Sequence, residues 1–234
     1  LIILFFLIIA VFAPVIAPYD PKEMIASYLP PSKEHILGTN DVGQDIFSEM
    51  VYGTRVSLYI GIFAAFIVTG VGTVLALVSG YFGGVADKII TAITNIAMAV
   101  PSLPLTVLLI AYLNPGKWSL IIAISITAWT GTARILRARV MQLKELPFIK
   151  IEKTMGVHPA VILFKHILPN IKDIILTRGA MAISGAMMTE AGLSFLGLGE
   201  FGEKSWGSVL HYAFFRNSIM KKQYWWYVPP IVCI

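Results

Sequence analysis

The chain alternates between long apolar segments and shorter segments in which charged residues gather. A transmembrane helix needs about 20 consecutive apolar residues, because each residue advances only about 1.5 Å along the axis. Segments of this kind are Leu1–Ala17, Val56–Gly80, Ile89–Leu113, Trp118–Ala133, Gly179–Leu198 and the stretch from Tyr224 onward. The pattern predicts an all-α fold, a polytopic transmembrane helical bundle of about six spans. The chain starts without Met inside one apolar run and stops inside another, so we expect the first and last helices to be truncated.

The composition agrees with a chain whose solvent is the bilayer. Hydrophobic residues make up 57% of the sequence and charged residues 13%, which leaves too few charges to cover a water-facing surface. The net charge is +5, but the basic residues lie beside apolar segments, so we expect membrane lipid rather than nucleic acid as a partner. The only cysteine, Cys233, lies in an apolar segment, which excludes an intrachain disulfide or a metal–thiolate cluster.

The distribution of charge between the loops predicts the orientation of the chain. Residues 134–178 hold nine of the 18 Lys and Arg residues against three acids, whereas residues 20–55 hold six acids against three bases. Because cytoplasmic loops are enriched in Lys and Arg, the first segment should lie inside and the second outside, with the N-terminus cytoplasmic. Counting alternate spans places residues 200–223 outside, but this loop holds four bases against two acids, which would favour the inside. The charge excess of residues 134–178 is larger, so we base the orientation on that segment.

Prolines and a glycine in the basic loop predict two short helices that lead into the next transmembrane span. Pro147 suits the first position of a helix, where its missing N–H would be unpaired, and Gly156 permits the bend that ends that helix. Pro159 can open a second short helix and Pro169 the next span. The alternative is an idle amphipathic loop on the lipid headgroups, anchored by Lys144, Lys150, Lys153 and Lys165.

The same segment resembles the cytoplasmic loop of a known family. It contains Gly156-Val157-His158-Pro159 and ends in His166-Ile167-Leu168-Pro169-Asn170. It is similar to the E-A-A-x-x-x-G loop, followed further on by I-x-L-P, of permease subunits of binding-protein-dependent ATP-binding cassette (ABC) importers, most closely the C-type permeases of the oligopeptide, dipeptide and nickel group. In this chain Lys150 stands at the glutamate position, Ile151 and Glu152 replace the alanines, and His166 stands where the general pattern has Ile. The glycine at the bend, Gly156, and its distance from Leu168-Pro169 match the family pattern.

Further matches in family order extend the resemblance over nearly the whole chain. They are Leu37-Gly38-Thr39-Asn40-Asp41, Gly43-Gln44-Asp45, Gly53-Thr54-Arg55-Val56-Ser57-Leu58, Gly80-Tyr81-Phe82-Gly83-Gly84, Pro101-Ser102, Leu193-Ser194-Phe195-Leu196-Gly197-Leu198-Gly199 and Trp206-Gly207. Gln44 and Glu49 replace common arginines of the family. Each match alone is weak, but their order and separations together are specific.

The resemblance implies a type I ABC importer permease fold and a non-catalytic subunit in a prokaryotic inner membrane. The implied partners are a second homologous permease, two ATPase subunits that bind ATP and Mg, and an extracytoplasmic solute-binding protein. The sequence has no G-x-x-x-x-G-K-[ST] motif, so it lacks the phosphate-binding loop with which P-loop ATPases hold ATP. The implied ATPase-coupling residues are Lys150, Glu152, Gly156, Val157, His158 and Pro159.

We expect three parts along the chain. Residues 1–18 form the first, truncated transmembrane helix, and residues 19–55 form an extracytoplasmic loop. Residues 56–234 form the permease core, within which residues 137–172 are the cytoplasmic coupling segment.

Other polar residues lead to weaker hypotheses. Glu190 is the acid well inside a predicted span, so it can be a proton relay or a contact for the cargo. The alternative is a structural residue that pairs locally, which its place before the Ser-Phe-Leu-Gly-Leu-Gly turn favours. His35, Asp41 and Asp45 fit no standard metal-site spacing. Asp41 can instead cap a helix that begins near Val42. We therefore expect neither a metal site nor catalytic residues.

The predicted function is that of a permease subunit of an ATP-driven importer, with peptides as the favoured cargo and nickel or oligosaccharides as alternatives. A rival from another class is a subunit of a proton-translocating membrane enzyme. That enzyme should carry ionisable residues in successive spans, whereas five of these six spans carry no charge. A purely structural membrane scaffold would not need the bent cytoplasmic segment.

Overall fold

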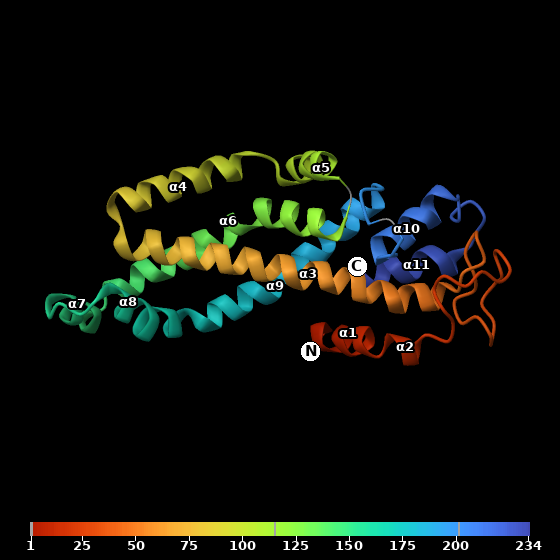
Figure 1. The fold of residues 1–234 in the computed structure, drawn as a ribbon, viewed down its shortest axis with the longest axis horizontal. Helices are drawn as coiled ribbons and strands as arrows, with labels where there is room; N and C mark the ends of the chain where they lie inside the picture. The colour runs from red at the N-terminus through yellow and green to blue at the C-terminus, as the bar shows by residue number, and fades with distance from the viewer. Residues whose placement is uncertain (1, 115, 201) are drawn as a thin grey trace. The chain divides into compact units, whose positions relative to one another are not determined.

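The computed structural model describes residues 2–114, 116–200 and 202–234, and all elements in these ranges are helices, which confirms the predicted all-α fold (Figure 1). They are α1 (Ile2–Val11), α2 (Ala13–Ile16), α3 (Ile46–Leu77), the π-helix η1 (Val78–Phe82), α4 (Gly84–Ala99), α5 (Ser102–Leu113), α6 (Lys117–Lys144), α7 (Pro147–Thr154), α8 (Pro159–Val161), the π-helix η2 (Ile162–Ile167), α9 (Leu168–Phe195), α10 (Trp206–Phe215) and α11 (Tyr224–Cys233). Leu1, with which the predicted first span begins, lies outside the described residues.

Two of the described helical segments, Ile46–Phe82 and Lys117–Lys144, are each long and apolar enough to cross a membrane. The pair α4 and α5 meets the same standard only when taken together, and it is bent by 89°. The predicted span Ile89–Leu113 is therefore wrong as a single straight helix. The bend falls at Pro101, which lacks the N–H that a continuous helix needs and which holds the preceding Val100 in an extended conformation. The total of about six spans stays a prediction.

The described chain divides into two compact units, and the first contains Leu1–Ile62, Val107–Ile121 and Gly185–Ile234. Its hydrophobic core joins the start of α3 to α10 and α11. The buried residues of this core are Ile46, Met50, Trp206, Val209, Ala213 and Trp226. The indole N–H of Trp206 donates a hydrogen bond to the backbone O of Met50 at 3.1 Å where α10 meets α3.

The second unit contains Phe63–Thr106 and Ile122–Ser184. Its core collects apolar side chains from the end of α3, the end of α6, α7, η2 and the start of α9: Ala76, Leu77, Leu136, Val140, Leu143, Ile149, Ile162, Ile167 and Ile171. Close helix approach is possible because a Cβ on Gly80 would lie only 2.8 Å from Cβ of Val140. Both π-helices border this core, η1 through Tyr81 and η2 through its two buried isoleucines.

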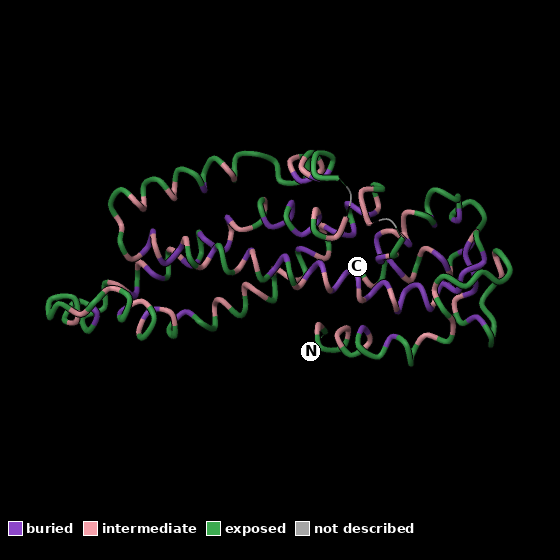
Figure 2. Tube along the Cα trace, viewed as in Figure 1, coloured by how far each residue is buried: buried purple, intermediate pink, exposed green. Residues whose placement is uncertain are grey.

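Many apolar side chains remain on the outside of the helices. Figure 2 shows α4 and α5 exposed over most of their length, whereas α3 and α6 are buried at intervals. The exposed side chains include Phe66, Ile96, Met98, Leu103 and Leu108. In a water-soluble protein such surfaces would be unfavourable, but lipid tails solvate them as well as another helix does.

Replacing Gly207 by alanine should destabilise the first unit. A Cβ at Gly207 would lie 2.4 Å from the backbone O of Ala191 and 2.6 Å from its Cα, so α9 and α10 would have to move apart. Overpacking of this kind costs about 1–3 kcal/mol, and the midpoint of thermal unfolding of the purified transporter should fall. Gly185→Ala is the matched control, because a Cβ there meets nothing within 4 Å. Equal midpoints for the two variants would contradict the expected crowding.

Candidate functional site

The predicted coupling segment begins as the punctuation of the sequence indicates. Pro147 occupies the first turn of α7, and Gly156 follows the helix with a φ of +79°, a conformation that glycine adopts without strain. Pro159 opens α8, and the Nδ1 atom of His158 accepts a hydrogen bond from the N–H of Ala160 at 3.3 Å. These local predictions are confirmed.

The second short helix, however, is not separate from the span that follows. α8 continues into η2 and η2 into α9, so residues 159–195 are helical without a break. Pro169 therefore lies in the first turn of α9. The prediction that it opens a new helix is wrong, because the chain before it is already helical. The π-helical turn before it widens the helix, which relieves the clash that a proline ring makes with the preceding turn.

α7 has a buried face and an exposed apolar face. Ile149 is 2% exposed and packs in the core of the second unit. Phe148, Ile151 and Met155 are 45%, 59% and 76% exposed, and their spacing of three and four residues places them on one side of the helix. Sequence reasoning missed this exposed face, although the spacing signals it. We call Phe148, Ile151 and Met155 the apolar face of α7.

Three of the residues that depart from the family pattern, Lys150, Glu152 and His166, are paired within the segment. Lys150 Nζ lies 2.8 Å from Glu145 Oε2, and this hydrogen bond lowers the pKa of the exposed Glu145 carboxyl. His166 Nε2 lies 2.9 Å from Glu152 Oε1. Exposed ion pairs add little stability, but the second pair joins α7 to η2. It turns one oxygen of Glu152 inward, toward this chain's own histidine.

The remaining predicted coupling residues differ in exposure. Val157 packs against the core of the second unit, whereas His158 is exposed. The space around Gly156 is open, since a Cβ there would meet nothing within 4 Å. Pro159 is partly buried at the start of α8. The structure therefore brings the six predicted residues into one segment but does not place them on one surface.

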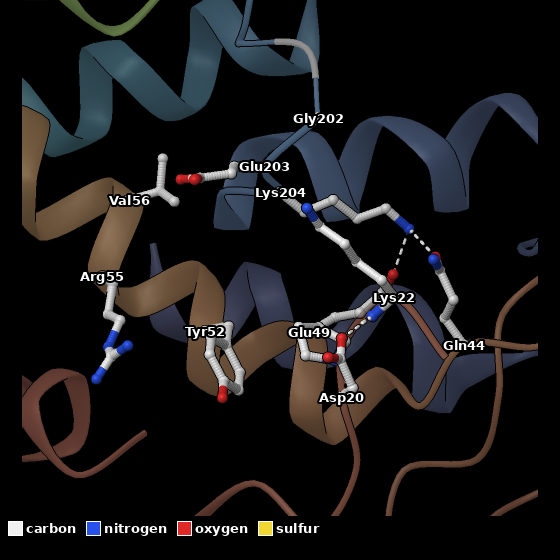
Figure 3. A pocket seen from close by; sticks show the side chains of 11 residues that line it. Asp20, Lys22, Gln44, Glu49, Tyr52, Arg55, Val56, Gly202, Glu203 and Lys204 are labelled. Atoms are coloured by element: carbon white, nitrogen blue, oxygen red, sulfur yellow. Dashed lines mark hydrogen bonds and ion pairs between the residues drawn. The ribbon is translucent and has the colours of Figure 1, made fainter. Parts of the chain in front are cut away.

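A second cluster of charged residues lies in the first unit, where the loop before α10 meets the start of α3. Glu49 is 1% exposed, and its Oε1 accepts hydrogen bonds from the amino group of Lys204 and, at 2.9 Å, from Asn40 Nδ2. Lys204 also donates to Gln44 Oε1 at 2.7 Å (Figure 3). Gln44 and Glu49 are the two residues that stand at common arginine positions of the resembled family, and Lys204 supplies a cation to both. Sequence reasoning missed Lys204.

The structure pairs His35 with Asp45 and pairs Asp41 with Arg216. His35 Nδ1 lies 3.0 Å from Asp45 Oδ1, whereas Asp41 Oδ2 lies 2.7 Å from Nε of Arg216. In the part of the chain that the structure describes, no group of three or more His, Cys, Asp or Glu side chains is arranged to hold a metal.

Asp45, and not Asp41, caps the helix that follows. Asp45 Oδ2 accepts a hydrogen bond from the N–H of Ser48 at 2.8 Å, and α3 begins at Ile46 rather than near Val42. The predicted cap at Asp41 is wrong because Arg216, distant in sequence, engages its carboxylate.

Glu190 is fully buried in α9 and pairs with hydroxyl groups. Its Oε2 accepts a hydrogen bond from Ser57 Oγ at 3.1 Å and its Oε1 from Ser194 Oγ at 2.6 Å. Ser57 Oγ in turn accepts from the N–H of Trp206 at 3.4 Å. The carboxyl group thus links α9 to α3 and to the start of α10, which is the local pairing expected of a structural residue.

Apolar helices of bilayer length define an integral membrane protein. Comparison with known proteins specifies the family: residues 72–231 match the binding-protein-dependent transport system inner membrane component. The chain belongs to this family and is the permease component of an ABC importer, a non-catalytic membrane subunit.

Curated relatives agree over most of the chain. It is 39% identical over 212 residues to the oligopeptide transport system permease protein OppC of Bacillus subtilis (strain 168), covering 89% of this chain and 70% of the relative. It is 35% identical to the dipeptide transport system permease protein DppC of the same organism, covering 88% of this chain and 65% of the relative. It is 36% identical to the glutathione transport system permease protein GsiD of Pectobacterium atrosepticum, covering 91% of this chain and 72% of the relative.

A solved structure shows the same fold. A chain of the MetNI methionine ABC transporter, solved in inward-facing conformations, superposes with a TM-score of 0.61 at 18% identity. The match covers 80% of this chain and 89% of the other. The predicted type I ABC importer permease fold is therefore confirmed.

Glu190→Ala should destabilise the protein, whereas Glu190→Gln should be close to the natural chain. Alanine leaves the buried hydroxyls of Ser57 and Ser194 without their acceptor, which costs about 1–3 kcal/mol. Glutamine keeps an acceptor oxygen at nearly the same place. Thermal unfolding and uptake of cargo by the purified transporter check both variants. A stable Glu190→Gln transporter that has lost uptake would contradict the structural role and favour proton or cargo contact.

Proposed function

We propose that this chain forms the translocation pathway of an ATP-driven importer together with a second, homologous permease. Two ATPase subunits bind ATP and Mg and hydrolyse ATP at the cytoplasmic face, and an extracytoplasmic binding protein delivers the cargo. The N-terminus is cytoplasmic in this arrangement, residues 1–18 belong to the first span, residues 19–55 to the extracytoplasmic side and residues 56–234 to the permease core. The charge asymmetry between residues 20–55 and 134–178 supports this orientation.

The observation that carries the proposal is the anchoring of α7. A helix that transmits force must be held firmly on one side and offer a surface to its partner on the other. Ile149 fixes α7 in a core that also contains residues of α6 and α9, the two long helices that the segment joins. The apolar face of α7 is exposed and fits a groove in an ATPase subunit. Closure of the ATPase pair then moves α6 and α9 through α7 and opens the pathway to alternate sides.

Within residues 137–172, we assign contact with the ATPase to Lys150, Gly156, Val157, His158 and Pro159 together with the apolar face of α7. Glu152 takes part indirectly, because its contact with His166 joins α7 to η2.

Peptides are the cargo that the relatives support. The relatives named above are permeases of oligopeptide, dipeptide and glutathione transport systems. We therefore assign short peptides to this importer. Uptake of a labelled dipeptide by vesicles that contain the complete transporter and its binding protein tests this assignment directly.

Gly156→Val should uncouple ATP hydrolysis from uptake. A β-branched residue is strained at the φ of +79° found at Gly156, so the bend after α7 will change even though no other atom crowds the site. Uptake into vesicles should fall several-fold while the ATPase subunits continue to hydrolyse ATP. Gly84→Val is the matched control, because Gly84 also has a positive φ (+57°) and open space but lies at the start of α4. A folded Gly156→Val transporter with the natural ratio of ATP hydrolysed to cargo carried would contradict the coupling role.

Ile151→Glu should release the ATPase subunits. The change places a charge in the centre of the apolar face of α7, and burying that charge in an apolar groove is unfavourable. A loss of about 1.4 kcal/mol weakens binding about tenfold, and the amount of ATPase that co-purifies from dilute detergent solution should fall accordingly. The control is Met220→Glu, which places the same charge on a residue that is 85% exposed and lies between α10 and α11. Equal recovery of ATPase with both variants would argue against docking at α7.

A further inference from the structure

A cavity of about 400 Å³ lies in the first unit and has no role in the coupling described above. Its walls come from three stretches: the loop around Asp20 and Lys22, residue Gln44 with the first turns of α3, and the loop at residues 202–204 (Figure 3). Its volume falls at the lower end of the range for small-ligand pockets, about 300–1,000 Å³. Its size therefore suits a compact molecule.

The charged side chains around this cavity carry both signs. They are Asp20, Glu49 and Glu203, and Lys22, Arg55 and Lys204. A cavity that bound a simple anion or a simple cation would be expected to have an excess of one sign. Balanced charge suits a ligand that carries both.

Most of these charged groups already have partners within the chain. Lys204 donates to Glu49 and Gln44, and Glu203 Oε2 lies 2.5 Å from Nζ of Lys117. The guanidinium of Arg55 donates to the backbone O of Ala10 at 2.5 Å. These groups shape the cavity and have little capacity left for a ligand.

Three groups remain for a ligand: Asp20, Glu49 and Lys22. The carboxylate of Asp20 accepts a hydrogen bond from the backbone N–H of Lys22 at 2.8 Å and forms no ion pair within the described ranges. The Oε2 atom of Glu49 is buried and has no hydrogen-bond partner among the residues that the structure describes. Leaving a buried acceptor unpaired is unfavourable, so a donor that entered the cavity would gain from meeting it. The amino group of Lys22 likewise has no partner within the described ranges, and it lines the same cavity as Glu49. The carboxylates of Asp20 and Glu49 and the ammonium group of Lys22 thus line one cavity.

We propose that this cavity binds a small zwitterion, a short peptide with a free N-terminus, whose ammonium group donates to Glu49 and whose carboxylate pairs with Lys22. The site rests on the proposed peptide cargo and refines it: the permease itself, and not the binding protein alone, selects for a free amino terminus. An ammonium group has three donors, so it can satisfy Glu49 Oε2 and still bond to a neighbouring wall.

Binding of defined dipeptides to the transporter tests the site. The complex of both permeases and both ATPases is purified without its binding protein, and L-alanyl-L-alanine is titrated into it by calorimetry. We expect saturable binding that weakens at least tenfold for N-acetyl-L-alanyl-L-alanine, which lacks the ammonium charge. Glu49→Gln should weaken binding of the free dipeptide at least tenfold and remove the preference over the acetylated one. Asp41→Asn, in which an acid of the loop before α3 is changed outside the cavity, should leave both values unchanged.

A second variant keeps the test decisive if Glu49→Gln does not fold, as judged by thermal unfolding. Lys22 is exposed and makes no side-chain contact that the fold needs, so Lys22→Gln should fold normally. It should lose the preference of the natural protein for L-alanyl-L-alanine over its C-terminal amide. No saturable binding by the natural complex, or unchanged preferences in both variants, would overturn the proposed site.

Failure of this site is distinguishable from failure of the proposed cargo. Uptake of labelled L-alanyl-L-alanine by vesicles that contain the complete transporter and its binding protein reports on the cargo alone. If uptake occurs but the cavity binds no dipeptide, the zwitterion site is wrong and peptide import stands. If uptake does not occur for any short peptide, the cargo assignment fails and the site fails with it.

Discussion

Every part of this structure depends on one constraint: in a hydrocarbon solvent, backbone N–H and C=O groups must find their partners inside the protein. Helices meet this demand within a single segment, so the described elements are helices throughout. Hydroxyl side chains follow the same rule. Thr73, Thr94 and Thr106 each donate a hydrogen bond of 2.7 Å to the carbonyl four residues earlier in their own helix. Short polar side chains therefore enter apolar helices without needing a partner from elsewhere.

The same constraint governs the charged groups that the helices carry. Arg137 Nε and Nη2 lie 2.6 Å and 2.7 Å from the two carboxylate oxygens of Asp87, a two-point contact that joins α6 to α4. Glu190 has two serine hydroxyls, and Glu49 has Lys204 and an amide. Glu49 nevertheless keeps one buried oxygen without a hydrogen-bond partner among the described residues, as Glu152 does.

The features that the sequence predicted well are those with local causes. Apolar length predicted the helices, and proline and glycine predicted the start of α7, the bend at Gly156 and the start of α8. Pro101 indicates the 89° bend between α4 and α5. The bend was not predicted because residues 89–113 contain no charge and are long enough to span a bilayer as one helix.

The features that the sequence could not predict have distant causes. Lys204 and Glu49 are 155 residues apart along the chain, and Asp41 loses its expected capping role to Arg216. No local pattern connects such residues, because the folding of several helices brings them together. The apolar face of α7 is intermediate: its spacing is local, but its exposure depends on which side of the helix the core covers.

The two π-helices have a consequence for how this permease can vary in length. A π-helical turn accommodates one residue more than an α-helical turn, and each added residue rotates everything beyond it by about 100° around the axis. η2 lies between the glycine bend and α9, and its two ends, Ile162 and Ile167, are both buried. Loss of a single residue from η2 would leave α7 and α9 out of phase, with polar side chains turned into the packing where Ile162 and Ile167 now lie. The length of this short stretch is thus as constrained as its chemistry.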